Sequence, residues 1–331
     1  MSKIPHGLDR ILSVVHAPWA VTPLMLATVY EILDRRLRDG PHALDAATVE
    51  ALTGRKQGEA TRAPAGGGVA LIPIRGTIAP RLTLLSDISG GTTFEALEPM
   101  LDAAVADPRV STIVFDIDSP GGSVFGAHEF ARAVLRARAV KPIIAHIHPV
   151  GASAAYWIAA CCTQVVCSPS AQVGSIGVLG VHEDRSGQLA QDGIKREVLS
   201  AGEGKTDGNP DGPLSDSARA QLLDHLAYYY GLFVQDVADG RGKSAATIRN
   251  EWQAHVFTAD TALAAGLVDR LDTLGATLAR FGATAPLTTP TAAASVDAPR
   301  DTPQEPPPAT GQDRAAQFAL MRAVFDLDTV H

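Results

Sequence analysis

The stretch Asp116-Ile-Asp-Ser-Pro-Gly-Gly122 follows an apolar, β-branched run at 111–117, whose length and composition predict a buried strand. Two glycines after a proline permit a turn that larger side chains would block. Such a turn leaves backbone N–H groups facing outward at the carboxyl end of a strand. Open α/β sheets bind ligands there, and an N–H group there can stabilise a developing oxyanion. Taken alone, a Pro-Gly-Gly turn is more often structural than catalytic.

Predicted strands and helices alternate on both sides of this turn. Apolar runs predict strands over 69–74, 142–147, 164–167, 176–181 and 196–199. Helical spacing predicts helices over 94–106, 124–138, 152–161, 185–193, 214–240, 245–252 and 258–265, with a last strand or turn over 266–269. This alternation requires crossover connections. We therefore predict an α/β fold with a mainly parallel sheet flanked by helices, plus helical extensions.

Composition divides the chain into four parts. Residues 1–67 are predicted to be an N-terminal extension and linker, and residues 68–282 the main domain. Residues 283–313 are rich in Pro, Thr and Ala, which predicts a disordered linker, and residues 314–331 have the pattern of an amphipathic helix. The apolar stretch 17–33 is interrupted by prolines, and we interpret it as a short docking or amphipathic helix.

Charge and cysteine content exclude several classes of function. The formal net charge of −8 disfavours nucleic acid as a partner, because phosphate binding relies on clustered Lys and Arg. The three cysteines (Cys161, Cys162, Cys167) fit neither a disulfide framework nor a zinc site, and we expect buried thiols in a reducing compartment. No long apolar run predicts a membrane anchor, and no signal peptide is recognisable, so we expect a cytoplasmic protein.

Two further segments carry residues suited to catalysis. Ser153 lies between small residues at the start of a predicted helix, where it is either an open nucleophile or an ordinary helix cap. Lys205 lies in a glycine-rich loop after a predicted strand, where most lysines are simply solvated. A nucleophilic serine needs a base and an oxyanion site. The sequence offers all three at predicted strand ends, so together they favour a serine hydrolase.

The same segments carry a resemblance to a known family. Five ordered stretches resemble the S49 peptidases, which include signal peptide peptidase A and phage head-maturation proteases: 70–77, 116–122, 151–157, 173–178 and 202–210. The resemblance extends from about Val69 to Asp272. It implies a Clp/crotonase-like fold with protein or peptide substrates.

The resemblance also implies a role for individual residues. Ser153 corresponds to the nucleophile and Lys205 to its general base, and the backbone N–H groups of Gly122 and Ala154 correspond to the oxyanion hole. Ser175 is expected to help orient the lysine. No metal or cofactor is implied.

A lysine base requires a special environment. The ordinary pKa of lysine, about 10.4, keeps the amine protonated at neutral pH, and burial lowers that pKa. We therefore expect Lys205 to be largely desolvated, to take the proton of Ser153 and to support an acyl-enzyme intermediate. His182 and His225 are the rival bases, because related Clp proteases use Ser-His-Asp.

The expected lack of an anchor and the single copy of the domain favour the phage or prophage branch of the family. The start of that branch is also similar to Pro18-Trp-Ala-Val-Thr-Pro23. In that branch the peptidase cuts scaffold, portal or coat proteins inside an assembling capsid, and the family forms homo-oligomeric rings. Three alternatives stay open: a cytoplasmic signal-peptide or protein-degrading peptidase of the same family, a crotonase-like acyl-CoA enzyme, and an inactive assembly factor on the peptidase fold.

Overall fold

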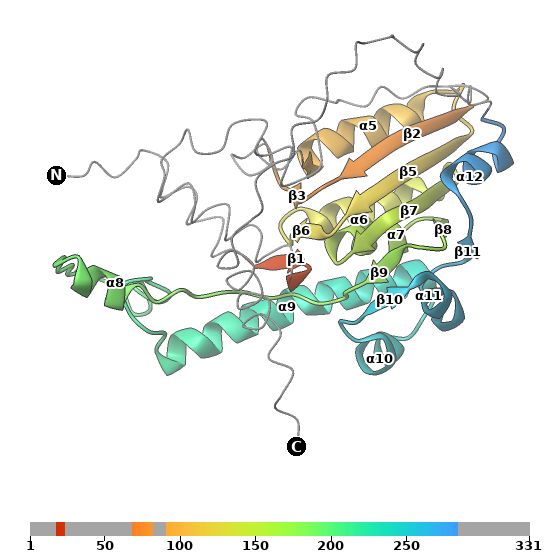
Figure 1. Cartoon of the computed structure of the whole chain (residues 1–331). Helices are drawn as coiled ribbons and strands as arrows, with labels where there is room; N and C mark the ends of the chain where they lie inside the picture. The colour runs from red at the N-terminus through yellow and green to blue at the C-terminus, as the bar shows by residue number, and fades with distance from the viewer. Residues whose placement is uncertain (1–17, 24–67, 82–90, 284–331) are drawn as a thin grey trace, which may run out of the picture. The chain divides into compact units, whose positions relative to one another are not determined.

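A mainly parallel sheet forms the centre of the fold. The computed structural model describes residues 18–23, 68–81 and 91–283, and seven strands within them join this sheet (Figure 1). The strand path is β10-β9-β7-β5-β2, with β8 beside β7 and β11 beside β8. Every pair is parallel except β10 with β9. The bounds are β2 Val69–Arg75, β5 Thr112–Ser119, β7 Ile143–Ala152, β8 Gln164–Cys167, β9 Gln172–Gly174, β10 Val256–Thr258 and β11 Arg270–Leu271.

Helices cover both faces of this sheet. The helices are α5 Phe94–Ala106, α6 Ala127–Ala137, α7 Ala154–Ala160, α8 Ser186–Gln191, α9 Asp216–Arg241, α10 Ala245–Thr247, a π-helix Ile248–Trp252, α11 Ala259–Ala265 and α12 Leu274–Arg280. Alternation along β5 turns Ile113 and Phe115 into the main core with α5, α6, α7 and α9. Val114 instead faces the opposite side, where α12 packs through Leu274 and Leu278. The predicted α/β class with a mainly parallel sheet is confirmed.

A second, smaller sheet includes the short strand Trp19–Val21, which lies far before the main domain in the sequence. Its order is β1-β6-β3-β4, with bounds β1 Trp19–Val21, β6 Gly121–Ser123, β3 Ile78–Ala79 and β4 Thr92–Thr93. The prediction of a helix across 17–33 is wrong at Trp19–Val21, because the backbone there pairs antiparallel with β6. Tertiary pairing overrides local preference at this position. Most of the predicted extension and linker 1–67, residues 284–313 of the predicted linker 283–313, and the predicted amphipathic helix 314–331 lie outside the described residues.

Two other predicted strands are absent from the described part of the chain. Residues 176–181 form only an isolated bridge between Leu179 and Trp19, and β9 lies just before them. Residues 196–199 are exposed and have no neighbouring strand to pair with. Apolar composition alone therefore overstated strand formation where no partner backbone is available. The helix α5 and the strand β8 begin and end at the predicted residues.

The three cysteines are buried free thiols, as predicted. Burial raises the pKa of the Cys167 thiol to about 11, so it stays protonated at neutral pH. Among the described residues, no helix is both long and apolar enough to cross a membrane.

His146 is a buried titratable group in the central strand β7. Its Nε2 lies 3.3 Å from the carbonyl oxygen of Asp272, while its Nδ1 has no hydrogen-bond partner among the described residues. Burial lowers the pKa of this imidazole below its ordinary value, and the nearby His148 and Arg75 lower it further. His146 is therefore neutral in the folded protein at neutral pH.

This burial predicts that His146 makes the protein less stable in mild acid. The unfolded chain binds a proton at His146 near pH 6.5, whereas the folded chain does so only at lower pH. Protonation of His146 therefore does not reduce the free energy of unfolding above about pH 6.5. Below that pH, the free energy of unfolding falls by up to about 1.4 kcal/mol per pH unit. Urea unfolding at several pH values should show a flatter profile for His146→Gln than for the wild type. The exposed His225→Gln serves as control, and equal slopes in all three proteins would contradict the assignment.

Candidate active site

Ser153 occupies a strained junction between β7 and α7. Its backbone has φ 55° and ψ −121°, a combination that L-residues rarely adopt. Its N–H donates to the carbonyl oxygen of Gly174 at 2.7 Å, and its own carbonyl accepts from the N–H of Trp157 at 2.8 Å. The side chain makes no capping hydrogen bond to α7. The interpretation of Ser153 as a simple helix cap is therefore wrong.

The hydroxyl of Ser153 is buried and loosely held. Its single hydrogen bond within the described residues runs from Oγ to the carbonyl oxygen of Gly177 at 3.4 Å, which is long for an O–H donor. A conformation that costs energy, without a strong bond for the hydroxyl, is typical of functional positions.

The Pro-Gly-Gly turn lies directly against this serine, as the sequence predicted. A Cβ atom added at Gly121 would lie 2.9 Å from the Ser153 Cβ and would collide with the carbonyl oxygen of Ala20. A Cβ atom added at Gly122 would overlap the backbone of Ile78 in β3. Both positions therefore require glycine. Ala154, the first residue of α7, is buried beside Ala20.

The helix that begins after Ser153 is anchored by a buried carboxylate from α9. Asp236 Oδ2 accepts from Trp157 Nε1 at 2.8 Å and lies 2.7 Å from His128 Nδ1 on α6. Arg132 on α6 contacts the other carboxylate oxygen at 3.4 Å. The Trp157 ring stacks on Phe233, with ring centroids 4.3 Å apart. The fully buried carboxylate of Asp236 thus has hydrogen-bond partners on α6 and α7, and it joins α7 to α9.

Ser175 lies in the segment 174–177, whose backbone carbonyl oxygens accept the hydrogen bonds of Ser153. It is buried, has φ 54°, and its N–H donates to the carbonyl oxygen of His255 at 2.7 Å. The neighbouring residues Gly174 and Gly177 receive the hydrogen bonds of Ser153. Ser175 is therefore close to Ser153 in the fold.

Lys205 is not brought to Ser153 in the single chain. It lies on residues 181–215, here called the arm, which include α8 and in Figure 1 run away from the sheet toward the start of α9. No residue of the arm is buried, and the side chain of Lys205 makes no hydrogen bond or ion pair with the described residues. The expected desolvation of Lys205 is therefore wrong for this chain alone, because the turn-rich arm has no core of its own.

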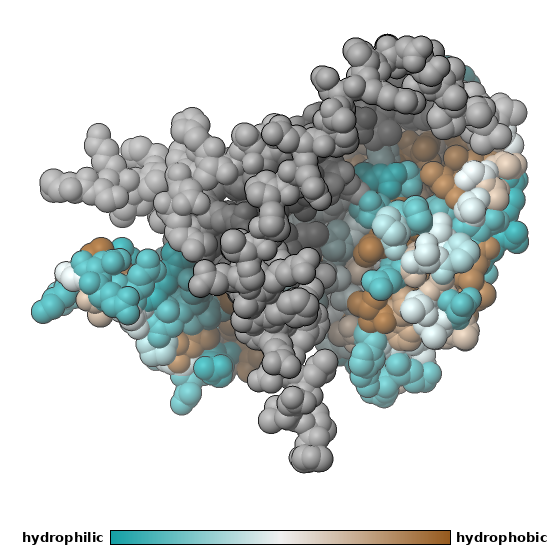
Figure 2. Space-filling model, in the orientation of Figure 1, coloured by the Kyte–Doolittle hydropathy of each residue, from teal (hydrophilic) through white to brown (hydrophobic). Residues whose placement is uncertain are grey.

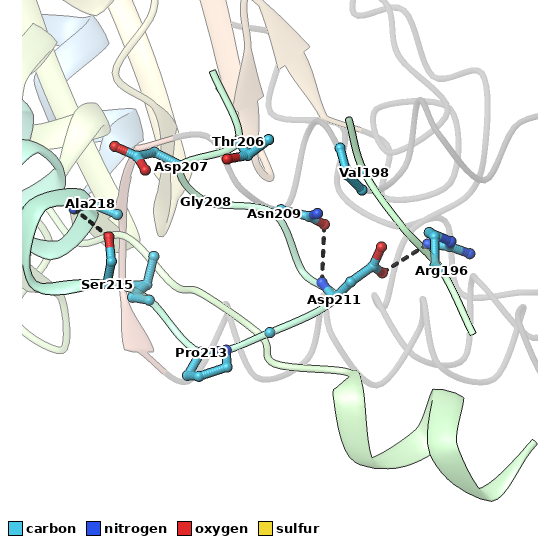
Figure 3. A pocket seen from close by; sticks show the side chains of 12 residues that line it. Arg196, Val198, Thr206, Asp207, Gly208, Asn209, Asp211, Pro213, Ser215 and Ala218 are labelled. Atoms are coloured by element: carbon cyan, nitrogen blue, oxygen red, sulfur yellow. Dashed lines mark hydrogen bonds and ion pairs between the residues drawn. The ribbon is translucent and has the colours of Figure 1, made fainter. Parts of the chain in front are cut away.

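Open cavities lie along the arm. One open cavity of about 390 Å³ is lined by Arg196, Val198, Thr206, Asp207, Gly208, Asn209, Asp211, Gly212, Pro213, Leu214, Ser215 and Ala218 (Figure 3). Arg196 pairs with Asp211 across it at 2.8 Å. The alternative bases also belong to this region, since His182 and His225 line a neighbouring cavity and His182 Nε2 lies 2.9 Å from the carbonyl oxygen of Gly212.

The buried Ser153 hydroxyl lies among backbone groups. In the described ranges, no three His, Cys, Asp or Glu side chains are arranged to hold a metal ion. What surrounds Ser153 is glycine and alanine backbone, which suits the stabilisation of an oxyanion by N–H groups.

Residues 136–287, which include Ser153 and Lys205, match peptidase family S49. The chain carries a peptidase S49 family domain. The sequence resemblance to this family is thereby confirmed.

Curated relatives of the S49 domain include two phage proteins. The chain is 32% identical over 204 residues to capsid assembly protease C of Escherichia phage lambda, covering 62% of this chain and 46% of the phage protein. It is also 32% identical over 204 residues to head-tail preconnector protein GP5 of Enterobacteria phage P21, covering 62% and 40%. The chain therefore spans less than half the length of these relatives.

Among solved structures, the S49 domain is similar to the 1510-N membrane protease specific for a stomatin homologue from Pyrococcus horikoshii. The TM-score is 0.39 at 15% sequence identity, over 65% of this chain and 79% of that one.

Two features of the site were not predicted from the sequence. One is β1, three apolar residues in a segment bounded by Pro18 and Pro23, a short apolar run with flanking prolines that could have indicated a buried strand. The other is Asp236, a charge in a helical stripe whose burial has no sequence signal.

The strain at Ser153 predicts an unusual order of stability. Glycine adopts a positive φ without strain. We therefore expect the free energy of unfolding of Ser153→Gly to be about 1 kcal/mol higher than that of Ser153→Ala. Ala155→Gly, two residues later inside α7, should instead be destabilised by about 1 kcal/mol or more. Urea unfolding of the three variants measures this. A Ser153→Gly variant less stable than Ser153→Ala would contradict the assigned strain.

Proposed function

We propose that this chain is a serine endopeptidase that works through a Ser-Lys dyad. The main support is the backbone of Ser153, which is held in a strained junction against Gly121, with its hydroxyl left almost unbound. In this proposal Ser153 is the nucleophile, Lys205 is its general base, and the N–H groups of Gly122 and Ala154 form the oxyanion hole. Ser175 helps to orient the lysine.

The proposed reaction has two halves. Neutral Lys205 takes the Ser153 proton as Oγ attacks the peptide carbonyl, and the oxyanion is stabilised by the backbone N–H groups. The lysine then gives the proton to the leaving amine, and an acyl-enzyme remains on Ser153. Water, deprotonated by the same lysine, hydrolyses that ester.

The exposed arm implies that the dyad is completed by assembly. Ile194, Val198 and Leu199 expose 48%, 49% and 85% of their surface, and the arm has no buried residue. Figure 2 shows hydrophobic residues scattered over the otherwise hydrophilic arm. We propose a homo-oligomer in which the arm packs, desolvates Lys205 and delivers it to a Ser153. Desolvation would lower the lysine pKa toward the working range of a base.

The substrate class is proposed from the relatives. Capsid assembly protease C and the head-tail preconnector protein belong to phages, so we propose that this peptidase processes a scaffold, portal or coat protein during head maturation. It would act in the host cytoplasm or in the procapsid. The peptidase domain is assigned to residues 68–282, to which β1 adds one strand.

Mass spectrometry of casein digests tests the dyad. Ser153→Ala and Lys205→Ala should each lower turnover at least about a thousandfold while remaining folded, because each removes an essential group. Lys195→Ala removes a charge from the same arm and should stay near wild-type activity.

Mixing the two inactive variants tests the route of the lysine. A mixture of Ser153→Ala and Lys205→Ala should recover activity if one copy supplies Lys205 to another, and stay inactive if each chain uses its own. Near-normal activity of Lys205→Ala alone would remove the lysine from the mechanism and make His182 the base to test.

A further inference from the structure

The strand β1 is part of what buries Ser153. Ala20 has no exposed surface and packs with Val124 and Ala154, which lie on either side of the candidate site. A single added methyl at Gly121 would meet both the Ala20 carbonyl oxygen and the Ser153 Cβ. The peptide carbonyl of Ala20 therefore lies next to the nucleophile, across one glycine.

Backbone pairing holds β1 on both edges. The N–H of Trp19 donates to Leu179 at 2.8 Å, and the N–H of Leu179 donates back to the Trp19 carbonyl at 2.9 Å. On the other edge, Ala20 is the register partner of Gly122. Because backbone groups of successive strand residues point to alternate edges, those of Ala20 face β6. The Ala20 carbonyl is thus turned toward the proposed oxyanion donor.

This slot between β6 and Leu179 has the chemistry of a peptide-binding site. Its contacts to β1 include main-chain hydrogen bonds on both edges, which any extended peptide without proline at the paired positions can make. The side chain at the centre is small, since the wall there is formed by Val124 and Ala154 with Val178 and Tyr229 beside them. The slot therefore suits an extended segment with a small apolar residue beside Ser153.

β1 is shorter than the central strands β5 and β7, although its three residues are buried. It has only three residues, and it is bounded by Pro18 and Pro23. The indole Nε1 of Trp19 is buried and has no hydrogen-bond partner among the described residues, which opposes docking. These features are those of an occupant that can leave.

We propose that the slot between β6 and Leu179 is the binding site for an extended substrate segment, and that β1 is its internal occupant in the free chain. This inference rests on Ser153 as nucleophile. A substrate must displace β1 before its carbonyl reaches Ser153, so the N-terminal segment competes with substrates.

Substitution within β1 of the full chain tests this competition. Ala20→Arg puts a charge into the buried contact and should release β1, while Pro23→Arg adds the same charge at an exposed position nearby. Removing an occupant raises apparent kcat/KM by the reciprocal of the fraction of open slots. We expect Ala20→Arg to cleave fluorescent casein with a kcat/KM about tenfold higher than Pro23→Arg or the wild type. The peptide acetyl-Pro-Trp-Ala-Val-Thr-Pro-amide should inhibit Ala20→Arg competitively.

Unchanged activity of Ala20→Arg would contradict the competition between β1 and substrates. A folded Ala20→Arg protein that is no faster than Pro23→Arg would show that β1 is a permanent part of the site. If Ala20→Arg does not fold, hydrogen exchange on the wild type decides: the same peptide at saturation should deprotect the amides of residues 18–23, and unchanged protection contradicts the proposal. Ser153→Ala runs in parallel. Full activity of that variant refutes the proposed peptidase site, whereas an inactive Ser153→Ala with no gain in Ala20→Arg refutes the slot alone.

Discussion

The backbone conformation of Ser153 is the constraint on which the rest of the site depends. A positive φ at a non-glycine residue costs energy, and it persists only where the surroundings enforce it. Here β7 leads into the residue, the Gly174 carbonyl fixes its N–H, and α7 starts from its carbonyl. Gly121 leaves the space that the serine needs. The parallel sheet thus places a serine hydroxyl at the end of a central strand, and this hydroxyl makes no capping hydrogen bond to α7.

A second set of contacts ties this serine to distant parts of the chain. Asp236 and Phe233 on α9 contact the Trp157 side chain on α7, so the two helices are joined by a hydrogen bond and a ring stack. Gly240 extends this contact, because a Cβ there would collide with the Ala160 carbonyl. The first turn of α9 follows directly on the arm that bears Lys205. One helix therefore connects α7, which begins directly after Ser153, to the loop that bears the proposed base.

The sequence predicted what depends on local pattern and missed what depends on pairing. The helix 94–106 and the strand 164–167 have clear periodicity or β-branched composition, and their bounds were correct. The meeting of the Pro-Gly-Gly turn with Ser153 was also predicted, because the ends of parallel strands converge. Trp19–Val21 was missed, since a three-residue strand exists only through its partners β6 and Leu179. The place of Lys205 was not predictable, because a loop without a core takes its position from what it packs against.

The central claim is that Ser153 is the nucleophile of a peptidase, and covalent labelling tests it most directly. The full chain would be treated with a fluorophosphonate, digested and mapped by tandem mass spectrometry. The account predicts one adduct per chain, on the peptide that contains Ser153, and loss of labelling after heat denaturation. An adduct on another serine, or labelling that survives denaturation, would contradict it.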